Sequence, residues 1–161
     1  MADRDVDVMV LSVGADLPNI SGYEAMPLER LTLLVVPRGG DASLIVPFLE
    51  APRVVERPDV FDVVSWKDGD DPIALATNLI GAAGRVAVGD QTWAGFLVDL
   101  SAELPDTRFV RASDVTAPIR SVKGAAEVEA LRAAGAAVDR IAAQIQGGEI
   151  PLVGRTEADV S

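Results

Sequence analysis

The segment from Ile119 to Ile145 is the strongest constraint on how this chain can fold, because it reads as one long helix. Apolar and small side chains recur in it at spacings of three and four residues, which places them along one face of a helix of about six turns. Alanines between them add helix propensity. This stripe consists of Val128, Leu131, Gly135, Val138, Ala142 and Ile145. We expect a helix over 124–146, whose narrow face needs another helix or a sheet packed closely against it.

Charge and composition exclude several classes of protein. The 161 residues are enough for one domain, or for one domain and part of another. Fourteen basic and 25 acidic residues give a net charge of -11, which argues against binding to nucleic acid or to anionic membranes. No apolar run approaches the roughly 20 residues of a membrane span. The absence of cysteine and the acidic N-terminus, which lacks the profile of a signal peptide, fit a cytoplasmic protein.

The chain contains no histidine, which excludes Ser-His-Asp and Cys-His nucleophiles and histidine-containing metal sites within it. Ser12, Ser21 and Ser113 therefore have no base partner. The acidic run at 68–71 lacks the downstream glutamate of a calcium loop and reads better as a turn that caps the next helix. Gly89-Asp90 lacks the further glycines of a nucleotide site. We expect neither catalytic residues nor metal ligands in this chain.

Strand patterns fill the first part of the chain. The β-branched run around 6–13 indicates a buried strand, and 14–22 is rich in turn residues and predicts a loop. Strand-like runs over 31–36 and 42–47 flank Pro37-Arg38-Gly39-Gly40-Asp41, which predicts a hairpin. These three strands would form a meander. One helical turn is expected within 48–57.

Strands and helices alternate after residue 60. A strand over 60–66 precedes Asp71, the expected N-cap of a helix that ends near Gly84. A short strand over 86–88 follows, and then an amphipathic helix, an extended segment over 107–110 and a linker over 112–121. The amphipathic face comprises Trp93, Phe96, Leu97, Leu100 and Leu104. The pattern predicts an α/β fold in which a mixed sheet, meander then β-α-β-α-β, is flanked by helices, with a long C-terminal helix added.

Four aromatic residues divide into two groups. Trp93 and Phe96 belong to the core by their spacing. Tyr23 and Trp66 are the aromatics best placed to face outward, but we favour the alternative that both pack locally.

Three segments resemble one family of enzymes. Residues Arg120 to Ala134 follow the pattern R-x-[IV]-K-x-x-x-E-[IV]-x-x-[LM]-[RK]-x-A, which resembles the segment leading into the catalytic domain of the creatinase/prolidase/Xaa-Pro aminopeptidase (M24) metallopeptidases. The segment from Gly154 to Val160 resembles that family's G-x-T-E-x-[DE]-[LV], and Asn19-Ile20-Ser21-Gly22-Tyr23 resembles its Y-L-T-G-[FY] turn. At Asn19 this chain departs from the aromatic residue that is common there.

The resemblance implies a domain organisation. Residues 1–117 would be a creatinase-like N-terminal domain of ribonuclease H-like fold, and residues 118–161 would be the linker and first helix (124–146) of a truncated catalytic domain. Thr156 and Asp159 resemble a capping box that begins another helix, so we expect the native chain to continue; a frayed tail is the alternative. Twelve arginines against two lysines hint at a GC-rich bacterial genome.

The resemblance also implies a function. The parent would be a metal-dependent Xaa-Pro dipeptidase or aminopeptidase with two divalent ions, Mn²⁺ or Co²⁺, in the catalytic domain. It would form a homodimer and would bind its peptide substrate in that domain. This chain would serve dimerisation and shape the active-site entrance. A loop at the substrate entrance would comprise Asn19, Ile20, Ser21, Gly22, Tyr23 and Glu24. Contacts between domains or subunits would involve Trp66, Arg120, Lys123, Val128, Leu131, Val138 and Ile145.

Two alternatives stay open. The parent could be a creatine amidinohydrolase, because that activity shares the N-terminal fold. The chain could also be a stand-alone binding or dimerisation module, in which case the stripe from Val128 to Ile145 would pair with that of a second copy. Arg120 and Lys123 lie at a helix start, where positive charge opposes the macrodipole. An acidic partner would remove this penalty, and our hypothesis is that the missing domain could supply it.

Overall fold

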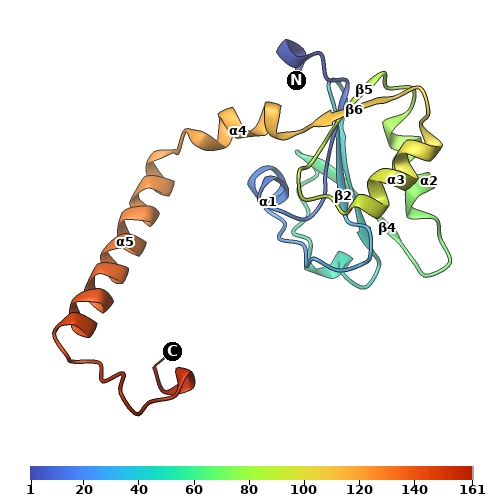
Figure 1. Cartoon of the computed structure of the whole chain (residues 1–161). Helices are drawn as coiled ribbons and strands as arrows, with labels where there is room; N and C mark the ends of the chain where they lie inside the picture. The colour runs from blue at the N-terminus through green and yellow to red at the C-terminus, as the bar shows by residue number, and fades with distance from the viewer. Residues whose placement is uncertain (161) are drawn as a thin grey trace. The chain divides into compact units, whose positions relative to one another are not determined.

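The computed structural model describes residues 1–160, and a six-stranded mixed sheet forms its centre (Figure 1). Its order is β4-β3-β2-β1-β5-β6. β2 is antiparallel to β1 and β3, whereas the other three pairings are parallel, so five strands point the same way. The strands are β1 Val8–Leu11, β2 Leu33–Pro37, β3 Ala42–Pro47, β4 Phe61–Trp66, β5 Arg85–Val88 and β6 Arg108–Arg111. The α/β fold with an initial meander is confirmed.

Residues 1–160 also contain five α-helices and three 3-10 turns (Figure 1). The α-helices are α1 Asp16–Ser21, α2 Pro72–Ile80, α3 Ala94–Glu103, α4 Ser113–Ser121 and α5 Ala125–Gln146. The 3-10 turns are η1 Ala2–Arg4, η2 Ala51–Arg53 and η3 Glu157–Asp159. Among the helices of residues 1–160, none has both the length and the apolar character that a membrane crossing requires.

The core lies on both faces of the sheet. Successive residues of a strand point to opposite faces, so β1 sends Val8 and Val10 toward the cluster that α2 and α3 complete, and Met9 and Leu11 toward the cluster that includes Leu17 of α1. All four residues of β1 are buried. A continuous apolar run is what a central strand covered on both faces requires.

Four structures predicted from short stretches of sequence are confirmed. β3 has the predicted limits and pairs with β2 as an antiparallel hairpin. The Asp71 carboxylate accepts hydrogen bonds from the N–H groups of Ile73 and Ala74, both at 3.0 Å, and so caps α2. The predicted turn within 48–57 is η2. The Asp159 carboxylate accepts from the Thr156 N–H at 2.9 Å, which completes the predicted capping box.

Two predicted segments are wrong. The stretch over 14–22 is not only loop, because α1 forms within it: Pro18 sits in the first turn, where its missing N–H costs nothing, and Gly22 ends the helix at φ 74°. The predicted linker over 112–121 contains α4, which carries Pro118 internally. In addition, α2 ends at Ile80, before the predicted Gly84, because Gly81 terminates it.

The aromatic assignments are partly correct. For Tyr23 and Trp66 the favoured interpretation, local packing, is confirmed, because they are only 5% and 8% exposed. Trp66 donates its indole N–H to the Leu31 carbonyl at 3.0 Å. Trp93 is not a core residue: it precedes α3 at the N-cap, is 43% exposed and stacks on Phe96 with ring centroids 6.1 Å apart.

The chain divides into two compact units, Met1–Arg120 and Ser121–Ser161. The second unit, as far as residue 160, consists of α5, η3 and their flanking segments. The helix predicted over 124–146 is confirmed as α5, and the Glu127 carboxylate accepts from the Gly124 N–H at 2.8 Å at its start. None of the residues of α5 is buried. The predicted domain boundary after residue 117 stays a prediction.

Candidate functional site at the ends of the parallel strands

The first unit has a crevice where the parallel strands β1 and β5 end side by side. The chain leaves β1 for α1 on one face of the sheet and leaves β5 for α3 on the other. Loops that diverge in this way open a crevice at the carboxyl ends of the strands, which is where open α/β sheets usually bind ligands. The crevice is a cavity of about 230 Å³, called the switch-point cavity below.

Three segments line the switch-point cavity. They are the β1–α1 loop, the β5–α3 loop and the two ends of α4. Their polar members are Ser12, Asp16, Asp90, Gln91, Ser113 and Arg120. The sequence analysis considered Ser12, Ser113 and Gly89-Asp90 only as catalytic or nucleotide-binding residues, and it missed Asp16 altogether. The signal available for them is position, since each lies at the end of a predicted strand or after it.

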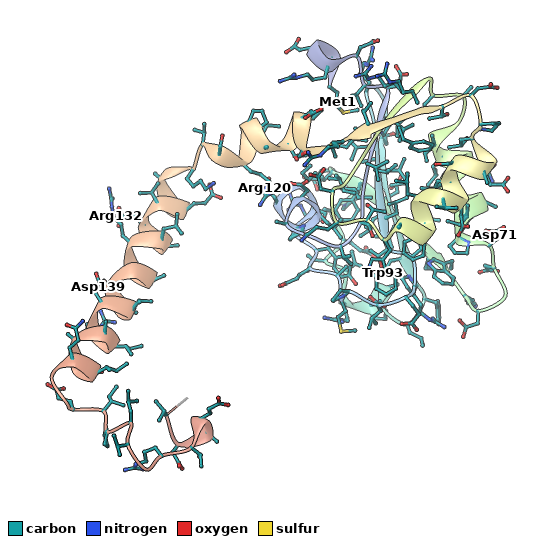
Figure 2. All side chains as sticks on the ribbon, in the orientation of Figure 1. Met1, Asp71, Trp93, Arg120, Arg132 and Asp139 are labelled. Atoms are coloured by element: carbon teal, nitrogen blue, oxygen red, sulfur yellow. The ribbon has the colours of Figure 1, made fainter. Side chains whose placement is uncertain are left out.

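Asp16 joins α1 to α4. One carboxylate oxygen accepts from Arg120 Nη1 at 2.9 Å, and the other accepts from Thr116 Oγ1 at 3.0 Å. The side chain of Asp16 is only 14% exposed, so this ion pair is better shielded than a surface pair. Figure 2 shows Arg120 on α4 beside α1. The expected acidic partner of Arg120 therefore lies in the first unit, in a residue that the sequence analysis did not consider.

Asp90 is held at the opposite side of the cavity by the end of β6. Its carboxylate accepts from Arg111 Nε at 3.1 Å and from a second nitrogen of the same guanidinium. The hydrogen bond from Arg111 holds the pKa of Asp90 below its ordinary range; partial burial opposes this, and hydrogen bonds from Ser113 reinforce it. Asp90 is therefore ionised at neutral pH.

Gly14 and Gln91 bring the two loops into contact. Gly14 has φ 130°, a backbone conformation that residues other than glycine rarely adopt. A Cβ atom at this position would overlap with Gln91 Oε1. A side chain at residue 14 would therefore strain the backbone and displace the end of the Gln91 side chain. The same two residues also line a second hollow of about 540 Å³, together with Glu24 and Trp93.

The predicted entrance loop, Asn19 to Glu24, is the end of α1 and the turn after it. Ser21 Oγ donates to the Leu17 carbonyl at 2.7 Å and accepts from the Tyr23 N–H at 3.1 Å. The Tyr23 hydroxyl donates to Glu50 Oε2 at 3.2 Å, and both residues are buried. Asn19, Gly22 and Glu24 are exposed. Ser21 and Tyr23 thus anchor this segment to the rest of the first unit, while Asn19, Gly22 and Glu24 face solvent.

The surroundings of the Tyr23 hydroxyl raise its pKa. Removal from water raises the pKa of this phenol, and the neighbouring Glu50 carboxylate raises it further through its charge and its hydrogen bond; Arg53 offsets part of this. The phenol therefore keeps its proton at neutral pH and donates it in the hydrogen bond to Glu50. This bond holds the turn after α1 against the segment before η2.

The predicted contact residues fall into two groups. Trp66 is buried in the first unit, and the Arg30 guanidinium lies 5.6 Å from the centre of its ring. The residues of the second unit are mostly exposed: Leu131 at 60%, Val138 at 65% and Ile145 at 39%, with Lys123 exposed and Val128 half-buried. Figure 2 shows Arg132 and Asp139 projecting from the same helix.

No metal centre is formed within residues 1–160, where no group of three or more His, Cys, Asp or Glu residues is suitably placed. The acidic run after β4 has local structural roles instead. Asp68 pairs with Arg30, Asp70 accepts from the Lys67 N–H at 2.7 Å, and Asp71 caps α2. The interpretation of this run as a turn and a cap is confirmed.

Known proteins share both the sequence and this fold. "Probable dipeptidase PepE" of Mycobacterium tuberculosis is 37% identical over 164 residues, covering 99% of this chain and 43% of that protein. The crystal structure of dipeptidase PepE from Mycobacterium ulcerans is 36% identical, with a TM-score of 0.84 and the same coverage. A prolidase from Thermococcus sibiricus shares the fold at 20% identity, with a TM-score of 0.84 over 99% of this chain and 44% of that one.

The chain thus spans 43% of the length of the PepE proteins that it matches. The Creatinase/Prolidase N-terminal domain family matches residues 1–122, which include the whole sheet and the switch-point cavity. The resemblance noted in the sequence is confirmed, and the chain belongs to the Creatinase/Prolidase N-terminal domain family.

Proposed function

We propose that this chain is the non-catalytic N-terminal part of a metal-dependent Xaa-Pro dipeptidase or aminopeptidase. The observation that carries the proposal is the extent of the similarity. The family match stops at residue 122, whereas the 37% identity to a probable dipeptidase continues over 99% of the chain. Residues 123–161 would therefore begin a second domain, which would hold two divalent ions, Mn²⁺ or Co²⁺.

The second unit would supply the first helix of that domain. α5 has 22 residues and none of them is buried, although its apolar stripe includes Leu131 and Val138. Packing, rather than helix propensity, stabilises most protein helices. In the proposed enzyme this stripe packs against the rest of the catalytic domain. If it pairs with a second copy instead, the chain is a dimerisation module.

The first unit would form the entrance of the active site of the neighbouring subunit in a homodimer. The turn after α1 supports this, because Tyr23 anchors it while Glu24 stays exposed beside a hollow that Trp93 also lines. A carboxylate at such an edge can attract the ammonium group of a peptide substrate.

Sequencing the reading frame beyond Ser161 and assaying the full product tests the proposal. A continuation with two aspartates, a histidine and two glutamates, together with Mn²⁺-dependent cleavage of Xaa-Pro dipeptides, is expected. Cleavage of creatine instead would establish the amidinohydrolase alternative. A stop codon near Ser161, with dimers of the 161-residue chain in light scattering, would leave the dimerisation module.

In the full enzyme, Glu24→Ala is expected to raise KM for dipeptides and to leave kcat nearly unchanged, because it removes attraction without touching the reacting atoms. Asp106→Ala is the matched control, since Asp106 is also exposed and lies outside both hollows. Equal KM values for the two variants would show that Glu24 does not help to attract the substrate.

A further inference from the structure

The hollow of about 540 Å³ beside the β1–α1 loop combines an exposed aromatic ring with a mostly apolar wall. We call it the Trp93 hollow. Its volume falls within the roughly 300–1,000 Å³ of sites that hold small molecules. Among the described residues, Glu24 is the only ionisable one that lines it, and much of the remaining wall comes from Pro18, Ala25 and Pro27. The Trp93 hollow therefore offers apolar surface and a single negative charge.

The two tryptophans of the chain have opposite surroundings. Trp66 is 8% exposed, and its indole N–H donates to the Leu31 carbonyl at 3.0 Å. Trp93 is 43% exposed, and no residue that the structure describes accepts a hydrogen bond from its N–H. Met26, in the segment that contributes to the wall, is 42% exposed. Large apolar side chains exposed around a concave wall mark a contact surface for a ligand or a partner.

Phe96 fixes the plane of the Trp93 ring. The two rings are nearly parallel, with an interplanar angle of 14° and centroids 6.1 Å apart. Phe96 is itself half-buried and packs against the core cluster that includes Leu100. Trp93 is also the N-cap residue of α3, so a helix holds its backbone. A ring held in this way loses little conformational freedom when a ligand packs on it, which favours binding.

The charge and the ring together define the ligand. The face of a tryptophan ring attracts apolar groups and also cations. The Glu24 carboxylate attracts a positive group and repels a phosphate or a carboxylate, and no lysine or arginine lines the hollow to compensate. A suitable ligand therefore carries a positive group beside an apolar one. The first residue of a peptide has this arrangement when its side chain is apolar, because its ammonium and its side chain share one carbon atom.

We propose that the Trp93 hollow binds the first residue of the peptide substrate, with the apolar side chain of that residue against the Trp93 ring and its ammonium toward Glu24. Trp93 is then a specificity-determining residue, which favours substrates that begin with a large apolar residue. The proposal rests on the proposed peptidase function, because it assigns the hollow to one part of that substrate.

The ratio of kcat/KM for Phe-Pro to kcat/KM for Gly-Pro tests the proposal in the full enzyme. Trp93→Ala is expected to lower this ratio about two- to tenfold, the effect of losing one aromatic pair. A variant that merely folds less well leaves the ratio unchanged, because the amount of folded enzyme cancels. Trp93→Phe keeps an aromatic ring and should retain most of the ratio. Val98→Ala is the matched control and should keep the original ratio, since Val98 is 65% exposed on α3 and does not line the hollow.

The ratios of the variants decide the proposal. An unchanged ratio in Trp93→Ala would overturn it. An equal fall in Val98→Ala would overturn it as well, because any disturbance of α3 would then have the same effect. If the full enzyme cleaves neither dipeptide, the proposed peptidase function fails instead, and binding to the 161-residue chain decides the inference about the hollow.

Three amides serve as probes for that binding measurement. Phenylalanine amide has an ammonium and an aromatic ring, glycine amide has only the ammonium, and N-acetylphenylalanine amide has only the ring. The indole N–H signal of Trp93 in NMR should shift saturably with phenylalanine amide, while that of the buried Trp66 should not. The other two amides should bind at least about threefold more weakly, because each lacks one of the two contacts. Glu24→Gln should remove the advantage of phenylalanine amide over its N-acetyl derivative. Equal binding of the three amides, or binding of none, would overturn the proposal.

Discussion

Arg120 Nη1 lies 2.9 Å from Asp16 Oδ1, so the last residue of the first unit is tied to the first residue of α1. Asp16 is 14% exposed and also accepts from Thr116. The arrangement holds α4 to the layer that α1 forms on its side of the sheet. It also gives Arg120 an acidic partner, although Arg120 lies in the last turn of α4 and not at a helix start as expected, so the macrodipole favours its charge there.

Asp16→Asn should therefore destabilise the first unit by about 1–3 kcal/mol, because it removes the charge from two hydrogen bonds in a largely shielded place. Urea unfolding followed by tryptophan fluorescence measures this, since both tryptophans lie in that unit. Asp5→Asn is the control: Asp5 pairs with Arg38 at 3.3 Å but is 88% exposed, and its loss should cost less than about 1 kcal/mol. Equal losses for the two variants would contradict the shielding of Asp16.

Tyr23→Phe should cost about 1–3 kcal/mol, because the buried Glu50 carboxylate loses the donor at 3.2 Å. The phenyl ring keeps the packing of the tyrosine, so the loss isolates the hydroxyl. The double variant with Glu50→Gln should lose less than the sum of the single changes if the two groups interact. A purely additive result in urea unfolding would show that they do not.

The Tyr23 hydroxyl should lose its proton at a higher pH than an ordinary tyrosine. Tyr23 is the only tyrosine, so tyrosinate absorbance of the folded chain reports on it alone. Its pKa should lie above the ordinary 10.0, chiefly through burial, and should return toward that value in urea. Because the folded pKa is raised, the associated stability is present below pH 10 and is lost as the pH rises above it. Tyr23→Phe should lack this alkaline loss, and a midpoint at or below 10.0 in the folded chain would contradict the prediction.

Gly14→Ala should destabilise the chain by about 1–3 kcal/mol, because its φ of 130° strains any side chain and the new Cβ would displace Gln91. Gly39→Ala is a matched control in the hairpin, where no atom lies within 4 Å and the backbone φ lies outside the region that favours glycine. Thermal unfolding compares the two. A neutral Gly14→Ala would show that the β1–α1 loop adapts more readily than the structure indicates.

Asp71→Ala should cost about 0.5–2 kcal/mol, the usual effect of removing an N-cap. Two N–H groups at the start of α2 lose their acceptor, and the packing of Ala76 and Ile80 against the sheet weakens with them. Asp106→Ala, an exposed aspartate outside any cap, should change stability by no more than about 0.5 kcal/mol. Circular dichroism during urea unfolding distinguishes the two variants.

Signals carried by neighbouring residues predicted most of the fold. The Pro37–Asp41 turn predicted the β2–β3 hairpin, and Asp71 with Pro72 marked the start of α2. The stripe from Val128 to Ile145 predicted α5. In each case the physical cause lies within a few residues of its effect, so periodicity and capping chemistry were sufficient.

The remaining features have causes that are distant in the sequence. Trp66 is buried because its N–H reaches the Leu31 carbonyl, and Tyr23 because it reaches Glu50. α1 forms although its residues favour turns, since Leu17 packs into the core. The switch-point cavity unites β1, β5 and α4, which are far apart in the chain. No local pattern contains these pairings, and tertiary packing overrides weak propensity.

The central position of β1 has a consequence for synthesis on the ribosome. β1 is made first, and β2 can cover one of its edges early, but its other neighbour β5 begins only at Arg85. Roughly 50 residues separate the end of β2 from β5, which at about 5–20 residues per second takes several seconds. Throughout that interval the nascent hairpin presents an unpaired edge of Val8–Leu11, an apolar strand that a chaperone or another nascent chain can bind.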